Sequence, residues 1–236
     1  MGHLIPIKTT VDVSDTHPAI AILPIGSFEQ HGSYLPLTTD TLIACIISET
    51  IADSYSVLQL SPVTISCSHE HKAWPGTVSI SSRTLHHLIA DIFQSLQQSG
   101  VETLVLINAH GGNYVLRNIV QEASVSGRHM ALFPESPHWA SARSAAELVT
   151  TDHEDMHAGE LETSILLHAY PESVKDGYLN ADHLADDRTG FVTLGMEAFT
   201  ETGVIGRPSL ASAIKGKAIL ASLASSFGDH MRTIRA

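Results

Sequence analysis

The sequence contains few charged residues, and few of those are basic. Charged residues make up 16% of the 236 residues, and 13 Lys and Arg stand against 25 Asp and Glu, for a formal net charge of −12. An acidic chain without a basic stripe repels a phosphate backbone, so we expect no nucleic-acid partner.

Cysteines and long apolar runs are also scarce. The two cysteines, Cys45 and Cys67, are too few for a disulfide scaffold. No stretch approaches the roughly 18 consecutive apolar residues of a membrane span. The N-terminal residues MGHLIPIKTT lack the basic and apolar regions of a signal peptide. We therefore expect a cytoplasmic protein with no membrane partner.

Histidine is the residue in excess. The 15 histidines outnumber the 13 Lys and Arg together. Histidine is the commonest metal ligand among side chains, and it titrates near neutral pH. This composition is typical of a protein with a metal site.

The apolar pattern predicts alternating strands and helices. Short apolar runs predict buried strands, and apolar residues at three- and four-residue intervals predict amphipathic helices. Strands are expected at Ala19–Ile25, Val57–Ile65 (with a break or bend at Pro62), Thr103–Ile107 and His129–Phe133. Helices are expected at Asp40–Tyr55, at Ser82–Ser99, from Asn113 to about Ser126, at Gly159–Ala169 and at Ala211–Met231, with loops or a short hairpin in residues 171–208.

This alternation predicts an α/β protein with a parallel sheet covered on both faces. No linker, repeat or low-complexity segment divides the chain, so residues 1–236 are expected to form a single domain. In an open parallel sheet, ligands bind beyond the carboxyl ends of the strands. The residues that follow the predicted strands are therefore the candidates for function.

Two candidates follow the first predicted strand, and a third begins the next helix. Glu29 and His31 lie two residues apart, and in an extended segment such residues project to the same side and can face one pocket. Asp40 opens the first predicted helix. Each has an ordinary alternative: helix capping or dipole compensation for Asp40, and a hydrogen-bonded loop position for His31.

The other candidates belong to later elements. His110 follows the third predicted strand and precedes two glycines, which allow close approach of backbone or substrate. The segment that opens the fourth predicted helix contains His157, Glu160 and Glu162. His157 and Glu160 share a face if His157 lies within the helix, whereas the two glutamates diverge. The alternative for both glutamates is compensation of the helix dipole.

Together these side chains suit a pair of metal ions. Three carboxylates and two histidines at strand ends and helix starts are a donor set for Zn²⁺ or Mn²⁺. A carboxylate that bridges two ions can hold them about 3.5–4 Å apart, close enough to activate a shared hydroxide.

Four ordered motifs resemble the signatures of the creatininase family of amidohydrolases. They are Pro24-x-Gly26-Ser27-x-Glu29-Gln30-His31-Gly32 with Leu35-Pro36-Leu37 and Thr39-Asp40, then Trp74-Pro75-Gly76-Thr77, Asn108-x-His110-Gly111-Gly112-Asn113, and His157-Ala158-Gly159-Glu160-x-Glu162-Thr163-Ser164. The resemblance spans about Ile22 to Leu167. It implies a three-layer α/β/α domain with a mostly parallel sheet, usually assembled as a homohexamer, with a binuclear metal centre.

The resemblance also implies roles for single residues. Glu29 and His31 resemble ligands of different ions, and Asp40 resembles the bridging carboxylate. His110 resembles a further ligand, and His157 resembles the family's catalytic histidine.

The fifth ligand is ambiguous. Creatininase has a glutamate two residues after the equivalent of His110, and this chain has Gly112 there. This departure counts against creatinine as the substrate, and it requires another acidic residue as the fifth metal ligand. We favour Glu162, with Glu160 as the competing choice.

The loop CSHEHKAWPGT adds two candidates for substrate binding. We expect His71 and Trp74 to line the pocket, because pockets combine aromatic walls with a few polar groups. The alternative is plain loop structure. Alternating histidines in one loop, without a cysteine partner, are a weak metal signal.

We therefore expect a metal-dependent amidohydrolase that cleaves a non-peptide C–N bond in a cyclic or small linear amide. A hydroxide activated by two divalent ions (zinc, manganese or both, with iron an alternative) would attack the carbonyl, and His157 would relay a proton to the leaving nitrogen. One alternative is a family deformylase, or a peptidase that trims a precursor peptide in redox-cofactor (mycofactocin-type) maturation, to which the HGGN sequence is closer. Another is a non-catalytic binding or assembly protein that keeps the metal for structure.

Overall fold

A four-stranded parallel sheet lies at the centre of the fold. The computed structural model describes residues 5–235. The strands are β1 (Ile20–Ile25), β2 (Leu58–Gln59), β3 (Thr103–Asn108) and β4 (His129–Phe133), in the spatial order β2-β1-β3-β4. β1 and β3 pair in parallel along their whole length, from Ile20 opposite Thr103 to Ile25 opposite Asn108. Their apolar residues are buried on both sides, as expected for a parallel sheet with two covered faces.

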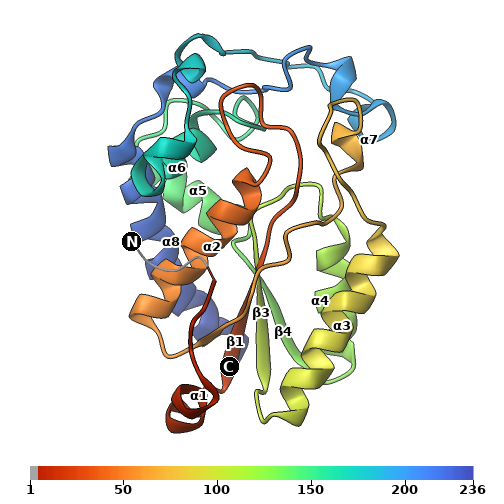
Figure 1. Cartoon of the computed structure of the whole chain (residues 1–236), viewed down its shortest axis with the longest axis vertical. Coiled ribbons are helices and arrows are strands. Elements are labelled where there is room, and N and C mark those ends of the chain that lie inside the picture. The colour runs from red at the N-terminus through yellow and green to blue at the C-terminus, as the bar shows by residue number, and fades with distance from the viewer. Residues whose placement is uncertain (1–4, 236) are drawn as a thin grey trace.

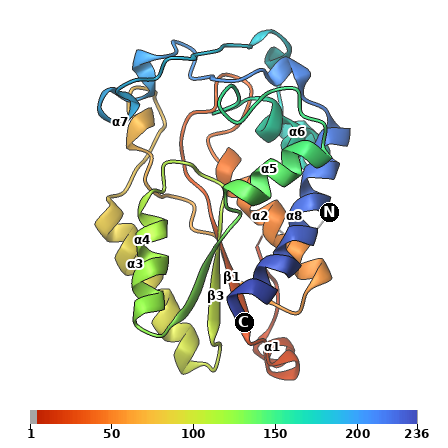
Figure 2. The ribbon, with the colours of Figure 1, turned by 180° about the vertical axis from the view of Figure 1, so that it is seen from behind.

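Helices cover both faces of the sheet, which confirms the predicted three-layer α/β/α arrangement. Figure 1 shows one helical layer on the left of the strands and the other on the right, and Figure 2 shows the same arrangement from behind. One layer holds α2 (Thr39–Ser54), α5 (Ser136–Ala145), α6 (Glu160–Ala169) and α8 (Ala213–Arg235), and the other holds α3 (Ser82–Gln98) and α4 (Val115–Val125). None of the helices in residues 5–235 is both long enough and apolar enough to cross a membrane.

Alternate residues of the central strands pack into two separate hydrophobic cores. Ile22 and Val105 face the α2–α8 layer, whereas Leu23 and Leu106 face the α3–α4 layer. Because successive side chains of a strand point to opposite faces, each strand contributes to both cores. This packing fixes the carboxyl ends of β1, β3 and β4 at one edge of the sheet.

Short helical turns and loops lie beyond this edge, at the top of Figure 1. The predicted loop region 171–208 contains α7 (Phe191–Leu194) and 3₁₀ turns at Pro171–Ser173, Asp176–Asn180 and Met196–Ala198, and a further 3₁₀ turn begins at its end, at Pro208–Leu210. A further 3₁₀ turn spans His69–His71, and α1 (Thr10–Thr16) precedes β1.

The second predicted strand is much shorter than expected. Only Leu58–Gln59 pairs with β1 as a strand, and beyond Pro62 a single bridge joins Val63 to Ile25. Proline has no N–H to donate to a ladder, so the break at Pro62 ends the regular pairing.

The sequence pattern missed one helix that matters for the site. α5 has the sequence SPHWASARSA, and only Ala142 in it is buried. A helix with so little apolar surface has no apolar stripe for a pattern to detect. The terminal helix runs over Ala213–Arg235 instead of the expected Ala211–Met231.

Candidate metal centre and substrate cavity

The carboxyl edge of the sheet brings the five predicted metal ligands together. The loop after β1 carries Glu29 and His31, the first turn of α2 carries Asp40, and the loop after β3 carries His110. These four side chains are buried, and Glu162 joins them from α6. They come from four separate segments because parallel strands end at the same edge of the sheet.

A glycine sets the position of Asp40. A Cβ on Gly26 would lie 2.3 Å from the backbone nitrogen of Thr41, so only glycine lets α2 begin against the end of β1. Asp40 lies in the first turn of this helix, where the dipole favours a carboxylate. Ser27 donates its hydroxyl to Oδ2 of Asp40 at 2.7 Å and holds the carboxylate in place.

Asp40 lies between two groups of possible ligands. Its Oδ2 is 3.0 Å from Nδ1 of His110, which is also 3.2 Å from Oε1 of Glu29. Its Oδ1 is 3.1 Å from Nε2 of His31, which is 4.0 Å from Oε2 of Glu162. The two oxygens of Asp40 thus face different histidines. This is the arrangement that a bridging carboxylate requires.

Two buried carboxylate oxygens in the cluster accept no hydrogen bond of good geometry among the described residues. They are Oε1 and Oε2 of Glu29, and the ring nitrogens of His71 and His110 approach Oε1 to 3.1 and 3.2 Å. Buried carboxylate oxygens are costly unless a donor or a cation satisfies them. The donor set of carboxylates and imidazoles, with Glu29 unsatisfied, fits a divalent metal ion.

The cluster also concentrates negative charge that needs compensation. Burial by itself would lower the pKa of His31, but Asp40 and Glu162 raise it to about 9. Burial, together with the charge of Asp40, raises the pKa of Glu162 to about 7. The carboxylates therefore hold positive charge on a fully buried imidazole, as they would hold a cation.

The two candidate glutamates of α6 have different surroundings. Glu160 is fully buried and points away from the cluster, where it accepts the N–H and hydroxyl of Thr150 at 2.9 and 2.7 Å and pairs with Lys215. Glu162 lies beside His31 and accepts the N–H of Ala158 at 2.6 Å. Only Glu162 forms a group with His31 and Asp40.

His157 lies just outside α6, which begins at Glu160, so the two side chains do not share a helix face. Nε2 of His157 donates to the carbonyl oxygen of Gln30 at 2.7 Å, which leaves the lone pair on Nδ1, 3.9 Å from Oε1 of Glu29. Burial, followed by the charges of His31 and His71, holds the pKa of His157 well below its usual range. His157 is therefore a neutral imidazole that can accept a proton.

His71 lies within the cluster and not in an open pocket. It is 3% exposed, and its Nε2 is 3.1 Å from Oε1 of Glu29. The amide of Gln30 donates to Nδ1 of His71 at 2.9 Å, and burial lowers the pKa of His71 to about 4. Trp74 is half-buried, with its ring centroid 6.4 Å from that of His71. Substrate binding by these two residues stays a prediction.

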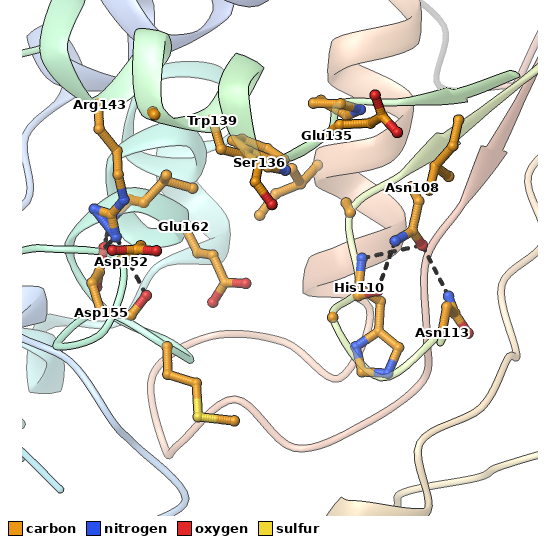
Figure 3. Close-up of a pocket in the computed structure, with 18 of the residues that line it drawn as sticks. Asn108, His110, Asn113, Glu135, Ser136, Trp139, Arg143, Asp152, Asp155 and Glu162 are labelled. Carbon is orange, nitrogen blue, oxygen red and sulfur yellow. Dashed lines mark hydrogen bonds and ion pairs between the residues drawn. The ribbon is translucent and has the colours of Figure 1, made fainter. Parts of the chain in front are cut away.

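A cavity of about 870 Å³ opens beside the cluster. Figure 3 shows His110 and Glu162 bordering it, with Trp139 on the wall formed by α5. His71 and Trp74 are not among its lining residues. A second recess of about 320 Å³ shares Arg117, Leu132, Glu135 and Ser136 with the cavity, so the two lie side by side.

The asparagines of the Asn-x-His-Gly-Gly-Asn motif hold the loop after β3. Asn108 donates to the carbonyl oxygen of His110 at 2.8 Å and accepts from Asn113 at 3.0 Å. Asn113 in turn accepts the N–H of Cys67 at 3.2 Å and so links two loops of the site. His110 donates from Nε2 to the carbonyl oxygen of Cys67 at 2.8 Å, which leaves Nδ1 free to face the carboxylates.

Comparison with known proteins places this site in a family. The family model described as "Creatininase: Creatinine amidohydrolase" matches residues 8–230. The chain belongs to the creatininase family. It is therefore a creatininase-family hydrolase with clusters of metal-ligand side chains.

Individual known proteins resemble this chain to different degrees. The mycofactocin precursor peptide peptidase of Mycobacterium ulcerans (strain Agy99) is 33% identical over 229 residues, which cover 92% of this chain and 85% of that protein. The creatinine amidohydrolase of Pseudomonas putida is 25% identical over 171 residues, 66% of each chain. The solved structure named "Creatininase Mn" has a TM-score of 0.80 at 22% identity and covers 98% of each chain, which supports the creatininase fold.

Sequence reasoning overlooked Gln30, although it lies within the first creatininase-family motif. Its carbonyl holds His157, and its amide donates to His71 and to the carbonyl oxygen of Gly203 at 3.0 Å. A Cβ on Gly203 would lie 1.8 Å from Oε1 of Gln30, so the 199–206 segment packs directly on this amide. Its position between Glu29 and His31 in the motif was the sequence signal that could have identified Gln30 as a site residue.

A second group of ligand-type side chains lies away from the creatininase-family motifs. It consists of Glu135, His138 and His230. Nδ1 of His138 accepts the N–H of Glu135 at 2.9 Å in the capping box of α5. The positive end of this helix dipole also disfavours a cation. These contacts explain His138 as a helix cap.

Proposed function

We propose that this protein is a metal-dependent hydrolase that cleaves an amide bond in a peptide. The cavity of about 870 Å³ beside His110 and Glu162 carries the proposal. Pockets for drug-sized ligands measure about 300–1,000 Å³, so this cavity is near the upper end, and a second recess adjoins it. A small cyclic amide would leave most of this space empty. The identity of 33% with a mycofactocin precursor peptide peptidase supports the same conclusion.

In this proposal, two triplets of side chains hold two divalent ions. Glu29, Asp40 and His110 form one triplet, and His31, Asp40 and Glu162 form the other. Within each triplet, the possible ligand atoms lie within 4.8 Å of one another. Ions bound there, zinc or manganese by the donor chemistry, would lower the pKa of water and polarise a carbonyl.

His157 moves the proton in the proposed reaction. Its Nδ1 carries a lone pair directed at the cluster, because Nε2 donates to the carbonyl oxygen of Gln30. Nδ1 takes the proton from the attacking water and delivers it to the nitrogen of the leaving amine, so that the amine departs neutral. The rings of His31 and His71, with centroids 4.1 and 4.5 Å away, hold the imidazole in this orientation.

The function is tested with a mixture of substrates. Zinc-loaded and manganese-loaded protein is incubated with a pooled library of short synthetic peptides together with creatinine, lactams and formamides, and the products are identified by mass spectrometry. We expect new peptide fragments with the wild-type protein. His157→Asn protein and chelated protein are the controls and should give none.

Cleavage of a non-peptide C–N bond is the second candidate. It is supported by the 25% identity with a creatinine amidohydrolase. Hydrolysis of small amides without any peptide cleavage would select this candidate. Turnover of neither class by metal-loaded protein would contradict both.

A further inference from the structure

A buried ion pair lies at the N-terminus of α6, at the wall of the cavity. Nη2 of Arg143 is 2.8 Å from Oδ2 of Asp155, and the two side chains are 12% and 1% exposed. Figure 3 shows both residues on the same side of the cavity as Glu162. Neither belongs to the two ligand triplets, and neither takes part in the proton transfer.

Asp155 caps the helix that carries Glu162. The residue before α6 is Gly159, which has no side chain to accept the first N–H groups of the helix. Asp155 supplies this acceptor: its Oδ1 accepts the N–H of Glu160 at 2.6 Å, and its Oδ2 accepts the N–H of Leu161 at 3.0 Å. The carboxylate also faces the positive end of the helix dipole.

The surroundings of Asp155 leave its carboxylate little freedom. A Cβ on Gly159 would lie 1.7 Å from Oδ1 of Asp155, and a Cβ on Gly206 would lie 2.9 Å from the same atom. Two glycines therefore make the space that the carboxylate fills. Any larger residue at position 159 would push Asp155 away from the helix.

Arg143 fixes the loop that leads into α6. Besides the carboxylate, its guanidinium donates to the carbonyl oxygens of Thr150 and Thr151, each at 3.3 Å, and of Asp155 at 3.4 Å. Both Nη atoms are thus bonded within the protein, although Arg143 lines the cavity. Arg117 lines the same cavity and forms no ion pair within residues 5–235.

We propose that Asp155 and Arg143 are positioning residues for Glu162. They hold the first turn of α6, and this turn carries Glu162 to its place 4.0 Å from His31. Without the cap, the first N–H groups of α6 lose their acceptors and the turn frays. Glu162 then leaves the triplet with His31 and Asp40, while the triplet of Glu29, Asp40 and His110 keeps its geometry. The inference rests on the proposed metal centre.

Metal binding, measured separately from activity, tests the proposal. Asp155→Asn and Arg143→Lys are made in the full chain, loaded with zinc and titrated with a competing chelator. We expect one of two zinc equivalents to bind about tenfold more weakly, as is typical when outer-shell support is lost, with the other unchanged. Arg143→Lys keeps the Asp155 carboxylate but removes the guanidinium that holds it and the loop before α6, so it tests the same positioning role even if Asp155→Asn fails to fold.

Two matched controls separate positioning from general loosening. Arg117→Lys alters the other arginine of the cavity and should leave both zinc sites unchanged. Glu160→Gln disturbs the same helical turn at a side chain directed away from the cluster, and should lower the melting temperature while both zinc affinities are kept.

Three results would overturn or separate the proposals. Wild-type zinc affinity at both sites in Asp155→Asn and Arg143→Lys would overturn the positioning role. If Glu160→Gln weakens zinc binding at the Glu162 site to the same extent, the positioning role is also overturned. Any damage to α6 would then be enough to weaken this site. Wild-type protein that binds two zinc ions but hydrolyses no amide would contradict the proposed function alone, since the binding measurement does not depend on turnover.

Discussion

The carboxylate of Glu70 occupies the space that a side chain at position 112 would need. A Cβ built on Gly112 would lie 1.9 Å from Oε1 of Glu70 and 2.5 Å from Nε2 of His110. Oε1 of Glu70 is 3.5 Å from this same Nε2, on the edge of the ring opposite Nδ1. The acid beside this edge of His110 therefore comes from the 3₁₀ turn His69–His71.

This relationship predicts that Gly112 and Glu70 are energetically coupled. Gly112→Ala should lower the free energy of unfolding by about 1–3 kcal/mol, because the new methyl group overpacks the site. Adding Glu70→Ala should recover part of the loss, as measured in a double-mutant cycle by urea denaturation. Gly111→Ala is the control, because a Cβ there meets nothing within 4 Å. Additive effects of the two substitutions would contradict the coupling.

The two glutamates of α6 should respond differently to substitution. Glu162→Gln should reduce the metal content from two equivalents to one, because amide oxygen is a poorer ligand than carboxylate in the triplet with His31 and Asp40. Glu160→Gln should keep both equivalents but lower the free energy of unfolding by about 2 kcal/mol, because it weakens a buried network with Thr150 and Lys215. Elemental analysis and denaturant unfolding measure the two effects. Loss of one metal equivalent in Glu160→Gln, with both equivalents kept in Glu162→Gln, would make Glu160 the ligand.

Asp40 should be indispensable for both ions. Its two oxygens face His31 and His110 separately, so Asp40→Ala removes a ligand from each triplet at once. We expect this variant to bind neither ion tightly and to lose turnover, in assays of metal content and hydrolysis. Asp40→Ala protein that folds and remains active would disprove the bridging assignment.

The histidine pair between α5 and α8 should weaken the fold in acid. Burial lowers the pKa of His138 and of His230, and the charge of His138 lowers that of His230 further, whereas Glu135 opposes both shifts. The unfolded pKa is about 6.5, so the unfolded chain binds these protons first. Stability is therefore complete above about pH 6.5 and declines as the pH falls through the lower pKa values of the folded state.

Urea unfolding between about pH 5 and pH 7 measures this decline. His230→Gln should make the dependence on pH shallower. His87→Gln, at an exposed position on α3, is the control and should keep the wild-type slope. An unchanged slope in His230→Gln would contradict the prediction.

Removal of metal should lower the melting temperature. Ions that bind only the folded state stabilise it by mass action, by about 2.7 kcal/mol when the free ion is at 100 times its dissociation constant. Chelation should therefore shift thermal unfolding downwards, and zinc or manganese should reverse the shift. Asp40→Ala protein is the reference, since it should show no response to chelator. A wild-type melting temperature that is independent of chelator would argue against tight binding at this site.

The sequence by itself predicted the layers of the fold and the edge at which the site lies. Strands such as Thr103–Asn108 have a continuous apolar and buried centre, Leu104–Ile107, and helices such as Ser82–Gln98 have a regular apolar stripe. Both signals arise from local geometry and are visible in a short window of sequence. α5 escaped notice because its single buried residue, Ala142, produces no such stripe.

The candidate site was partly predictable for the same reason. Glu29, His31 and His110 follow predicted strands, and parallel strands deliver such residues to one edge of the sheet. What the tertiary structure alone decided is which side chains touch. Glu160 turns to Lys215, 55 positions away, whereas Glu162 turns to His31, and nothing in their shared helical turn distinguishes them. These contacts depend on how distant segments pack, and no short stretch of sequence contains that information.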